Sequence, residues 1–319
     1  MSKELKSIQI NYTNYSAEDK KALGGFDPTK SDNTLTADDL TKLSPEQLQT
    51  TYQIFKNYRL DANGYSESAA NKRNIAAYAK KNQKNPKDYV KAAAHSNQFL
   101  LFGESHESPK TRAFVATLPD TLKQEGFTHF AIEVDASKQG QIDEYLKTGN
   151  KKALAGNTWI NDEFLAILDA CKKAGLKVVC IDDHSVPGEN RDMSDAKMFK
   201  NLKRLVLDDN PRAKIAIYIG RSHISESQKL NFVQGGHIVD TPTKEGFLGY
   251  LLEMYAPNKS HSIAIIDPLE RPSDLVSHLR DIVKKHFALS VDSSPISTVV
   301  DMSFFNETFG GNYDGLILL

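Results

Sequence analysis

The chain has 319 residues, of which 39% are hydrophobic and 25% are charged, and its 40 Lys and Arg residues nearly balance its 41 Asp and Glu residues. A net charge of -1 argues against a nucleic-acid binder, which carries a basic excess, and no apolar run approaches the ~18 to 20 residues that cross a bilayer. Two cysteines, Cys171 and Cys180, are too few for a disulfide framework.

The first residues, MSKELKSIQINYTNY, lack the apolar core of a secretory signal peptide. We therefore expect a cytoplasmic protein, or one that is secreted by a route that needs no signal peptide. We expect neither a membrane span nor a nucleic-acid partner.

Residues 1–92 are rich in Lys, Asn, Gln, Ser and Ala and show no strong strand pattern. The sequence Ser-Pro-Glu-Gln at 44–47 predicts the start of a helix, because a Ser cap and a Pro at the first helical position favour initiation. An Ala-rich stretch predicts a second helix over 67–81, and the polar residues 82–88 predict a break. We expect an N-terminal helical region that serves as an interaction or delivery module for a protein partner.

Two acidic stretches in this region resemble parts of calcium-binding EF-hand loops. The first, 27–39, lacks the Gly of the sharp turn and has one residue too many, and the second, 61–65, lacks an acidic residue at its end. Ordinary Asx turns and a helix cap are the simpler interpretation.

From residue 93 onward, short apolar runs alternate with amphipathic stretches. The runs are continuously apolar, as expected for strands that helices cover on both faces, and they occupy 99–102, 130–132, 178–181, 215–219, 237–239, 263–266 and 316–319. Asn161 and Pro272 mark helix starts, and Gly175 marks a helix end. We expect residues 93–319 to form one α/β domain with a central, mostly parallel sheet flanked by helices.

Residues capable of acid–base chemistry follow four of these runs. They are Gly103-Glu104-Ser105-His106, Ile132-Glu133-Val134-Asp135, Ile181-Asp182-Asp183-His184 and Gly220-Arg221-Ser222-His223. Ligands of open α/β sheets bind beyond the carboxyl ends of the strands, so these side chains are expected at one rim. The form Gly-x-Ser-His occurs twice, which is the strongest functional signal in the sequence.

Histidine titrates near neutral pH, and a neighbouring carboxylate fixes its tautomer and raises its basicity. His106 and His223, together with Glu104 and Glu133, therefore suit the activation of a water molecule. A divalent metal held by His106, Glu133 and His223 is the open alternative. A carboxylate on an apolar strand, such as Glu133, is costly unless it has a partner or a function.

Weaker site candidates lie in the same strand-end segments: Asp182, Asp183, His184, Ser105, Arg221 and Ser222. An Asp after a strand often caps the next helix. The two serines resemble the nucleophile of a Gly-x-Ser-x-Gly turn, but Glu107 and Ile224 stand where the second Gly belongs. A serine nucleophile is therefore the weaker alternative, and neither loop has the pattern of a phosphate-binding loop.

Four segments together resemble the superfamily that unites erythromycin esterases, ChaN-like haem-binding proteins and Tiki/TraB-type proteases: 99–106, 131–133, 190–192 and 217–223. Its members have an α/β fold, two Gly-x-x-His motifs, a strand Glu and an Arg at the start of a long helix. The resemblance covers about residues 95–240 and leaves residues 1–92 unmatched.

The resemblance implies a role for each matching residue. His106 would be the general base or a metal ligand, Glu104 and Glu133 would orient it or bind the metal, and His223 would be the partner histidine. Arg191 would stabilise developing negative charge. The Glu104-Ser105-His106 spacing is nearer to the ChaN-like and Tiki forms, because the esterases have one more residue between Glu and His.

We therefore predict a hydrolase of ester or amide bonds that acts on a small-molecule or peptide substrate, and a bacterial effector or toxin is compatible with this pattern. A non-enzymatic binding or effector protein on the same scaffold is one alternative, and a haem- or metal-binding protein is another. A divalent metal is the candidate cofactor. Haem is the weaker candidate, because ChaN-like members are usually lipoproteins and this sequence shows no lipobox.

Overall fold

The computed structural model describes residues 69–106, 108–157, 160–183, 191–226, 232–234, 237–239, 246–267, 274–292, 294–297 and 312–319. The helix start predicted at 44–47 and both stretches that resemble calcium loops lie outside these residues.

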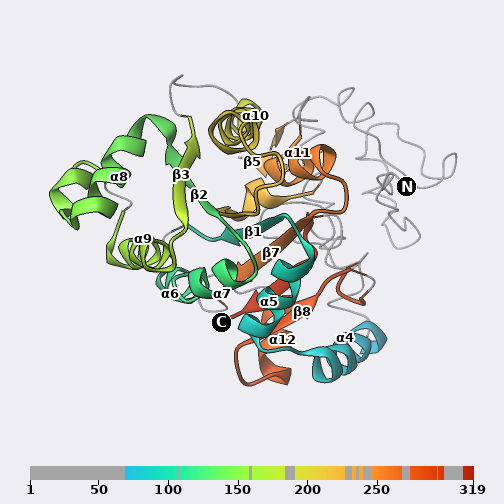
Figure 1. Ribbon diagram of the computed structural model, residues 1–319. Helices are drawn as coiled ribbons and strands as arrows, with labels where there is room; N and C mark the ends of the chain where they lie inside the picture. Colours follow the sequence, from blue (N-terminus) through green and yellow to red (C-terminus); the bar gives the residue numbers. More distant parts are fainter. Residues whose placement is uncertain are drawn as a thin grey trace, which may run out of the picture.

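Among the described residues, the strands are β1 Phe99–Glu104, β2 His129–Asp135, β3 Lys177–Asp182, β4 Ile215–Gly220, β5 Phe232–Gln234, β6 His237–Val239, β7 Ser260–Ile266, β8 Phe287–Ser290 and β9 Gly315–Leu318. Seven of them form the central sheet, in the order β3-β2-β4-β1-β7-β9-β8 (Figure 1). All neighbours in this sheet pair parallel except β8, which runs antiparallel to β9. The predicted central, mostly parallel sheet is confirmed.

The strands at the centre of the sheet are those with continuous apolar runs. Every residue of β1 and β4 is buried, which explains why these runs do not alternate with polar residues. One prediction needs correction: β6 pairs antiparallel with β5 in a separate two-stranded sheet and not with the central strands. β8 was not predicted from the sequence.

Helices cover both faces of the sheet. They are α4 Ala69–Asn82, α5 Pro86–Ser96, α6 Pro109–Val115, α7 Pro119–Gln124, α8 Gln139–Thr148, α9 Asp162–Ala174, α10 Arg191–Leu202, α11 Leu248–Tyr255 and α12 Asp274–Ile282. Short 3₁₀ turns occupy η2 Ala136–Lys138, η3 Lys151–Leu154 and η5 Arg221–Ile224, and a π-helical turn occupies η4 Lys203–Leu207.

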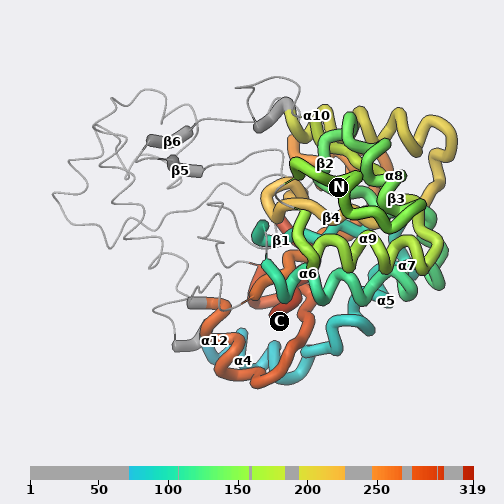
Figure 2. Tube along the Cα trace, turned by 90° about the vertical axis from the view of Figure 1, so that its left-hand side faces the viewer, coloured from blue at the N-terminus to red at the C-terminus, as the bar shows by residue number. Residues whose placement is uncertain are grey.

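The two faces have separate apolar cores. One core joins α4, α10, α11 and α12 to the sheet, and the other joins α5 to α9 to the opposite face. Figure 2 shows α10 on one side of β2, β3 and β4, with α6 and α7 on the other. No helix of the described residues is both long and apolar enough to cross a membrane.

The described part of the N-terminal region packs on the sheet domain. α4 confirms the helix predicted over 67–81, and its Ile75 and Ala79 are buried in the first core. α5 begins at Pro86 behind the Asn85 cap, and its Tyr89 and Val90 are buried in the second core. The domain boundary predicted at residue 92 therefore lies within α5.

The predicted helix signals of α9 are also confirmed. The Asn161 side chain accepts a hydrogen bond from the backbone N–H of Phe164, which caps the helix, and Gly175 ends it with a φ of 70°. This cap fixes the first turn of α9, which packs next to α6.

Candidate active site

Three adjacent strands bring the predicted residues together. β2, β4 and β1 lie side by side and parallel, so their carboxyl ends form one rim. Glu104 ends β1 directly opposite Gly220, which ends β4. Glu133 lies near the end of β2, where the register with β3 shifts between Ile132 and Asp135. Such irregularities redirect side chains and are common beside active sites.

The two Gly-x-Ser-His loops interlock through their glycines. A Cβ added to Gly220 would lie 2.7 Å from His106 Nε2 and 3.3 Å from Glu133 Oε2. A Cβ added to Gly103 would lie 2.9 Å from the Cα of Arg221 and 2.7 Å from Cδ1 of Ile224. Each glycine therefore leaves room for the other loop, and Gly220 leaves room for the His106 imidazole.

His106 is the accessible histidine of the pair. Its side chain is 57% exposed, and its Nδ1 lies 3.7 Å from Oε1 of the buried Glu104, which is an ion-pair distance. Glu104 is the largest influence on the pKa of His106 and raises it, burial lowers it, and Glu133 raises it further. The net result is a pKa above the ordinary value.

Glu104 is held from behind by two buried groups. The Tyr218 hydroxyl of β4 donates a hydrogen bond to Glu104 Oε2, and Arg112 Nε of α6 lies 3.5 Å from the same oxygen. Arg112 Nη1 donates to Asn161 Oδ1 at 2.7 Å. Burial and the nearby Glu104 charge raise the pKa of Tyr218 well above its ordinary value, so it remains a phenol that can donate.

His223 lies between two carboxylates. Its Nδ1 is 3.0 Å from Asp195 Oδ1, and its Nε2 is 3.4 Å from Glu133 Oε1. Both His223 and Asp195 are buried, with side chains 5% and 1% exposed. The backbone N–H of Leu248 also donates to Asp195 Oδ1, and that of Gly220 donates to Glu133 Oε2 at 2.6 Å.

These contacts set the charge of the buried group. Burial lowers the pKa of His223, but Asp195 and Glu133 outweigh it and raise the pKa well above the ordinary value. Burial raises the pKa of Glu133, but His223, His106 and the Gly220 N–H lower it to about 2. The structure thus favours an imidazolium between two carboxylates, and we call Asp195, His223 and Glu133 the ionic triad.

The remaining predicted residues have other positions. Asp182 ends β3 and its Oδ1 accepts from the Ser194 hydroxyl of α10, while Asp183 Oδ2 lies 4.0 Å from Lys197 Nζ of the same helix. Both carboxylates therefore contact side chains of α10. Arg221 and Ser222 are buried in η5, and Ser105 is partly buried in the β1–α6 loop.

Two further predicted residues fall at the edge of the described structure. Arg191 is the first residue of α10, one turn before Asp195. His184 lies outside the described residues.

The described residues include no group of three His, Cys, Asp or Glu side chains arranged to hold a metal ion. Both ring nitrogens of His223 face carboxylates, which leaves neither directed at a shared ion. The metal role predicted for His106, Glu133 and His223 therefore carries no step in the mechanism proposed below.

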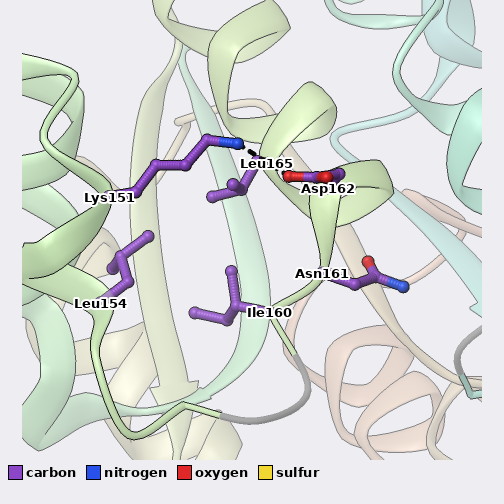
Figure 3. A pocket seen from close by; sticks show the side chains of 6 residues that line it. All are labelled: Lys151, Leu154, Ile160, Asn161, Asp162 and Leu165. Atoms are coloured by element: carbon purple, nitrogen blue, oxygen red, sulfur yellow. Dashed lines mark hydrogen bonds and ion pairs between the residues drawn. The ribbon is translucent and has the colours of Figure 1, made fainter.

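A pocket of about 360 Å³ lies at the start of α9 (Figure 3). An ion pair between Lys151 Nζ and Asp162 Oδ1, 2.7 Å apart, spans two of the residues that line it. None of the predicted site residues lines this pocket. The convergence of acid–base groups at the strand ends, and not this pocket, therefore defines the candidate site.

Three residues of the site were not predicted from the sequence. Asp195 lies within α10, 28 residues before His223 in the chain. Tyr218 belongs to an apolar strand, and Arg112 to a helix. The available signal was Tyr218 itself, because the hydroxyl of a buried Tyr usually has a hydrogen-bond partner.

Comparison with known proteins identifies the fold. No protein-family model matches the chain, and no curated protein matches its sequence. A mutant of erythromycin esterase EreC in its open conformation matches over 72% of this chain and 92% of its own, with 10% identity and a TM-score of 0.50. The chain has the erythromycin esterase fold.

The comparison also matches other solved structures. A Bacillus cereus protein matches over 78% of this chain and 97% of its own, with 12% identity and a TM-score of 0.52. The type III effector HopBA1 matches over 74% and 92%, with 17% identity and a TM-score of 0.45. The resemblance to the erythromycin esterase superfamily that the motifs predicted is confirmed at the level of the fold.

Proposed function

We propose that the chain is a hydrolase of ester or amide bonds, with His106 as the base that activates water. The observation that carries this proposal is the position of His106, which is exposed to solvent while Glu104 lies beside its Nδ1 and the imidazole packs against Gly220. EreC, with which the chain shares its fold, is an erythromycin esterase.

The proposed reaction uses the two nitrogens of His106 differently. Glu104 favours the tautomer with a proton on Nδ1, so Nε2 is the proton acceptor. Water attacks the substrate carbonyl carbon as Nε2 takes its proton, and a tetrahedral oxyanion forms. When the carbon–oxygen or carbon–nitrogen bond breaks, that proton passes to the leaving group, which gives a carboxylic acid and an alcohol or amine.

The ionic triad has a supporting role in this proposal. His223 is buried and bonded on both sides, so it holds Glu133 and the Gly220 loop behind His106. This differs from the direct part in water activation that the sequence pattern predicted for His223. Arg191, at the start of α10, is the cation that we propose for the oxyanion.

A panel of p-nitrophenyl esters and p-nitroanilides tests the proposal. We expect the wild-type chain to hydrolyse at least one member, and His106→Gln to lower kcat by roughly 10²- to 10⁴-fold, the usual contribution of a general base. His95→Gln is the matched control, because His95 is also exposed and lies 3.0 Å from a carboxylate, Glu125. Its activity should equal that of the wild type.

Two results would count against the proposal. Equal activity of His106→Gln and the wild type would remove His106 from the mechanism. A chain that cleaves no member of a broad panel would favour the non-enzymatic effector alternative.

A further inference from the structure

The Glu104 carboxylate is buried, and its two oxygens have different surroundings. Oε1 faces the exposed His106 imidazole, whereas Oε2 receives the Tyr218 hydroxyl and faces Arg112 Nε. A buried carboxylate is expensive unless its oxygens are paired. The Tyr218 hydrogen bond and the Arg112 charge at Oε2 offset this cost, and Oε1 faces His106.

Arg112 is itself fixed on its far side. Its Nη1 donates to Asn161 Oδ1, and its guanidinium lies 5.2 Å from the ring centroid of Phe164, in the first turn of α9. The centroids of the Phe164 and Tyr218 rings are 6.4 Å apart. The first turn of α9 therefore contacts both partners of Glu104, Arg112 and Tyr218. Figure 3 shows the Asn161 side chain pointing away from the side chains of Leu154 and Ile160.

Neither partner of Glu104 can meet a substrate directly. Arg112 is 2% exposed and Tyr218 is 1% exposed. We propose that Tyr218 and Arg112 are positioning residues that hold the Glu104 carboxylate in the orientation that faces His106. The first turn of α9, through Asn161 and Phe164, holds Arg112 in turn.

The need for such positioning follows from the location of His106. Its side chain is mostly exposed and lies in the β1–α6 loop, where packing alone leaves an imidazole several rotamers. A carboxylate fixed at the strand end gives the imidazole one defined partner. In metal sites, the partners that orient a ligating side chain contribute about 10- to 100-fold to activity, and we expect an effect of this size here.

Tyr218→Phe tests the proposal, because it keeps the buried ring and removes only the hydroxyl. The inference rests on the proposed function, but its first measurement needs no substrate. In the full-length chain labelled at histidine, NMR couplings about the χ1 bond report the rotamer of His106. We expect one rotamer in the wild type and averaging among rotamers in Tyr218→Phe.

Tyr145→Phe is the matched control. Tyr145 is also buried, and its hydroxyl donates to a carboxylate, Asp169 Oδ1, at 3.0 Å, between α8 and α9. This variant should leave the His106 rotamer unchanged. With an ester that the wild type cleaves, Tyr218→Phe should lower kcat by roughly 10- to 100-fold at constant KM, and Tyr145→Phe should change neither.

The outcomes distinguish failure of the positioning role from failure of the proposed hydrolase function. A single His106 rotamer in Tyr218→Phe, or averaging in both variants, would overturn the positioning role. Averaging in Tyr218→Phe alone, in a chain that hydrolyses no ester, would support the positioning role and reject the proposed hydrolase. If Tyr218→Phe does not fold, Arg112→Lys decides by the same measurement, because it keeps the positive charge and loses the guanidinium that bridges Glu104 and Asn161.

Discussion

The two Gly-x-Ser-His loops have the same four-residue form and different surroundings. His106, in the loop after β1, is 57% exposed and has one carboxylate beside it, whereas His223, in the loop after β4, is 5% exposed and lies between two. The repeated motif therefore produces one accessible histidine and one buried, charged histidine. Parallel pairing of β1 with β4 brings both to the same rim, and the two glycines let the loops pack closely together.

This difference in exposure indicates a chemical role for the first loop and a structural role for the second. The first loop is suited to chemistry, because a base must reach both substrate and solvent. The second is suited to support, because its histidine is held in an ion-paired network that a substrate cannot enter without displacing it. The following predictions test this division, beginning with the largest expected effect.

Loss of one charge from the ionic triad should strongly destabilise the chain. Asp195→Asn removes a buried anion from His223, and breaking a buried pair in this way typically costs about 3–5 kcal/mol. Chemical denaturation measures the change in the free energy of unfolding. Asp169→Asn is the control, because Asp169 is exposed and should lose under about 1 kcal/mol. Equal losses in both variants would show that the triad adds no stability of its own.

Gly220→Ala should damage activity far more than stability. The added methyl group would occupy the position of the His106 imidazole, which can move because it is the end of an exposed side chain. A displacement of about 1 Å can lower a rate by about 100-fold. Steady-state kinetics on a cleaved ester, together with Tm, measures both effects. Full activity in this variant would show that the space at Gly220 is not needed for His106.

Gly103→Ala should lower the stability of the chain more than Gly220→Ala does. Its added methyl group would meet the backbone of Arg221 and the buried Ile224, neither of which can move freely. Overpacking of this kind typically costs about 1–3 kcal/mol. Denaturant unfolding should show this loss. A stability equal to that of the wild type would contradict the interlocked packing.

The ionic triad should stabilise the folded chain most strongly within a limited pH range. The pKa of Glu133 is held at about 2 against an ordinary 4.5, so its stabilisation is present above pH 4.5 and is lost as pH falls toward 2. The pKa of His223 is raised well above 6.5, so its stabilisation is complete below pH 6.5 and is lost as pH rises through the folded value. The triad should therefore contribute most between about pH 4.5 and 6.5.

Unfolding free energies measured across this range provide the check. Each proton taken up or released on unfolding changes stability by at most about 1.4 kcal/mol per pH unit. Asp195→Asn should flatten the decline above pH 6.5, because it removes one cause of the raised pKa of His223. An unchanged decline in that variant would mean that another group is responsible.

The sequence was sufficient to predict the parts of this site that depend on strand geometry. Glu104, Glu133, His106 and His223 all follow continuous apolar runs, and parallel strands must bring such residues to one rim. The edge strand β8 was missed because it is only four residues long and pairs antiparallel after a basic stretch, which hides its pattern.

The supporting residues could not be predicted in the same way. Asp195 reaches His223 from a helix, and its role depends on how α10 packs over the sheet rather than on any local motif. In the sequence, Arg112 resembles an ordinary exposed Arg of a helix. In the structure, it is buried against Glu104 and Asn161. Burial of charge depends on tertiary packing, which short sequence windows do not record.

The most direct test of the account is one pH titration that follows both histidines by long-range ¹H–¹⁵N NMR. The division between the loops predicts that His223 remains an imidazolium, with both ring nitrogens protonated, well above the pH at which His106 loses its proton. The signal lost in His106→Gln identifies His106, and the signal lost in His223→Gln identifies His223 among the nine histidines. A His223 that titrates at or below the pH of His106 would contradict the account.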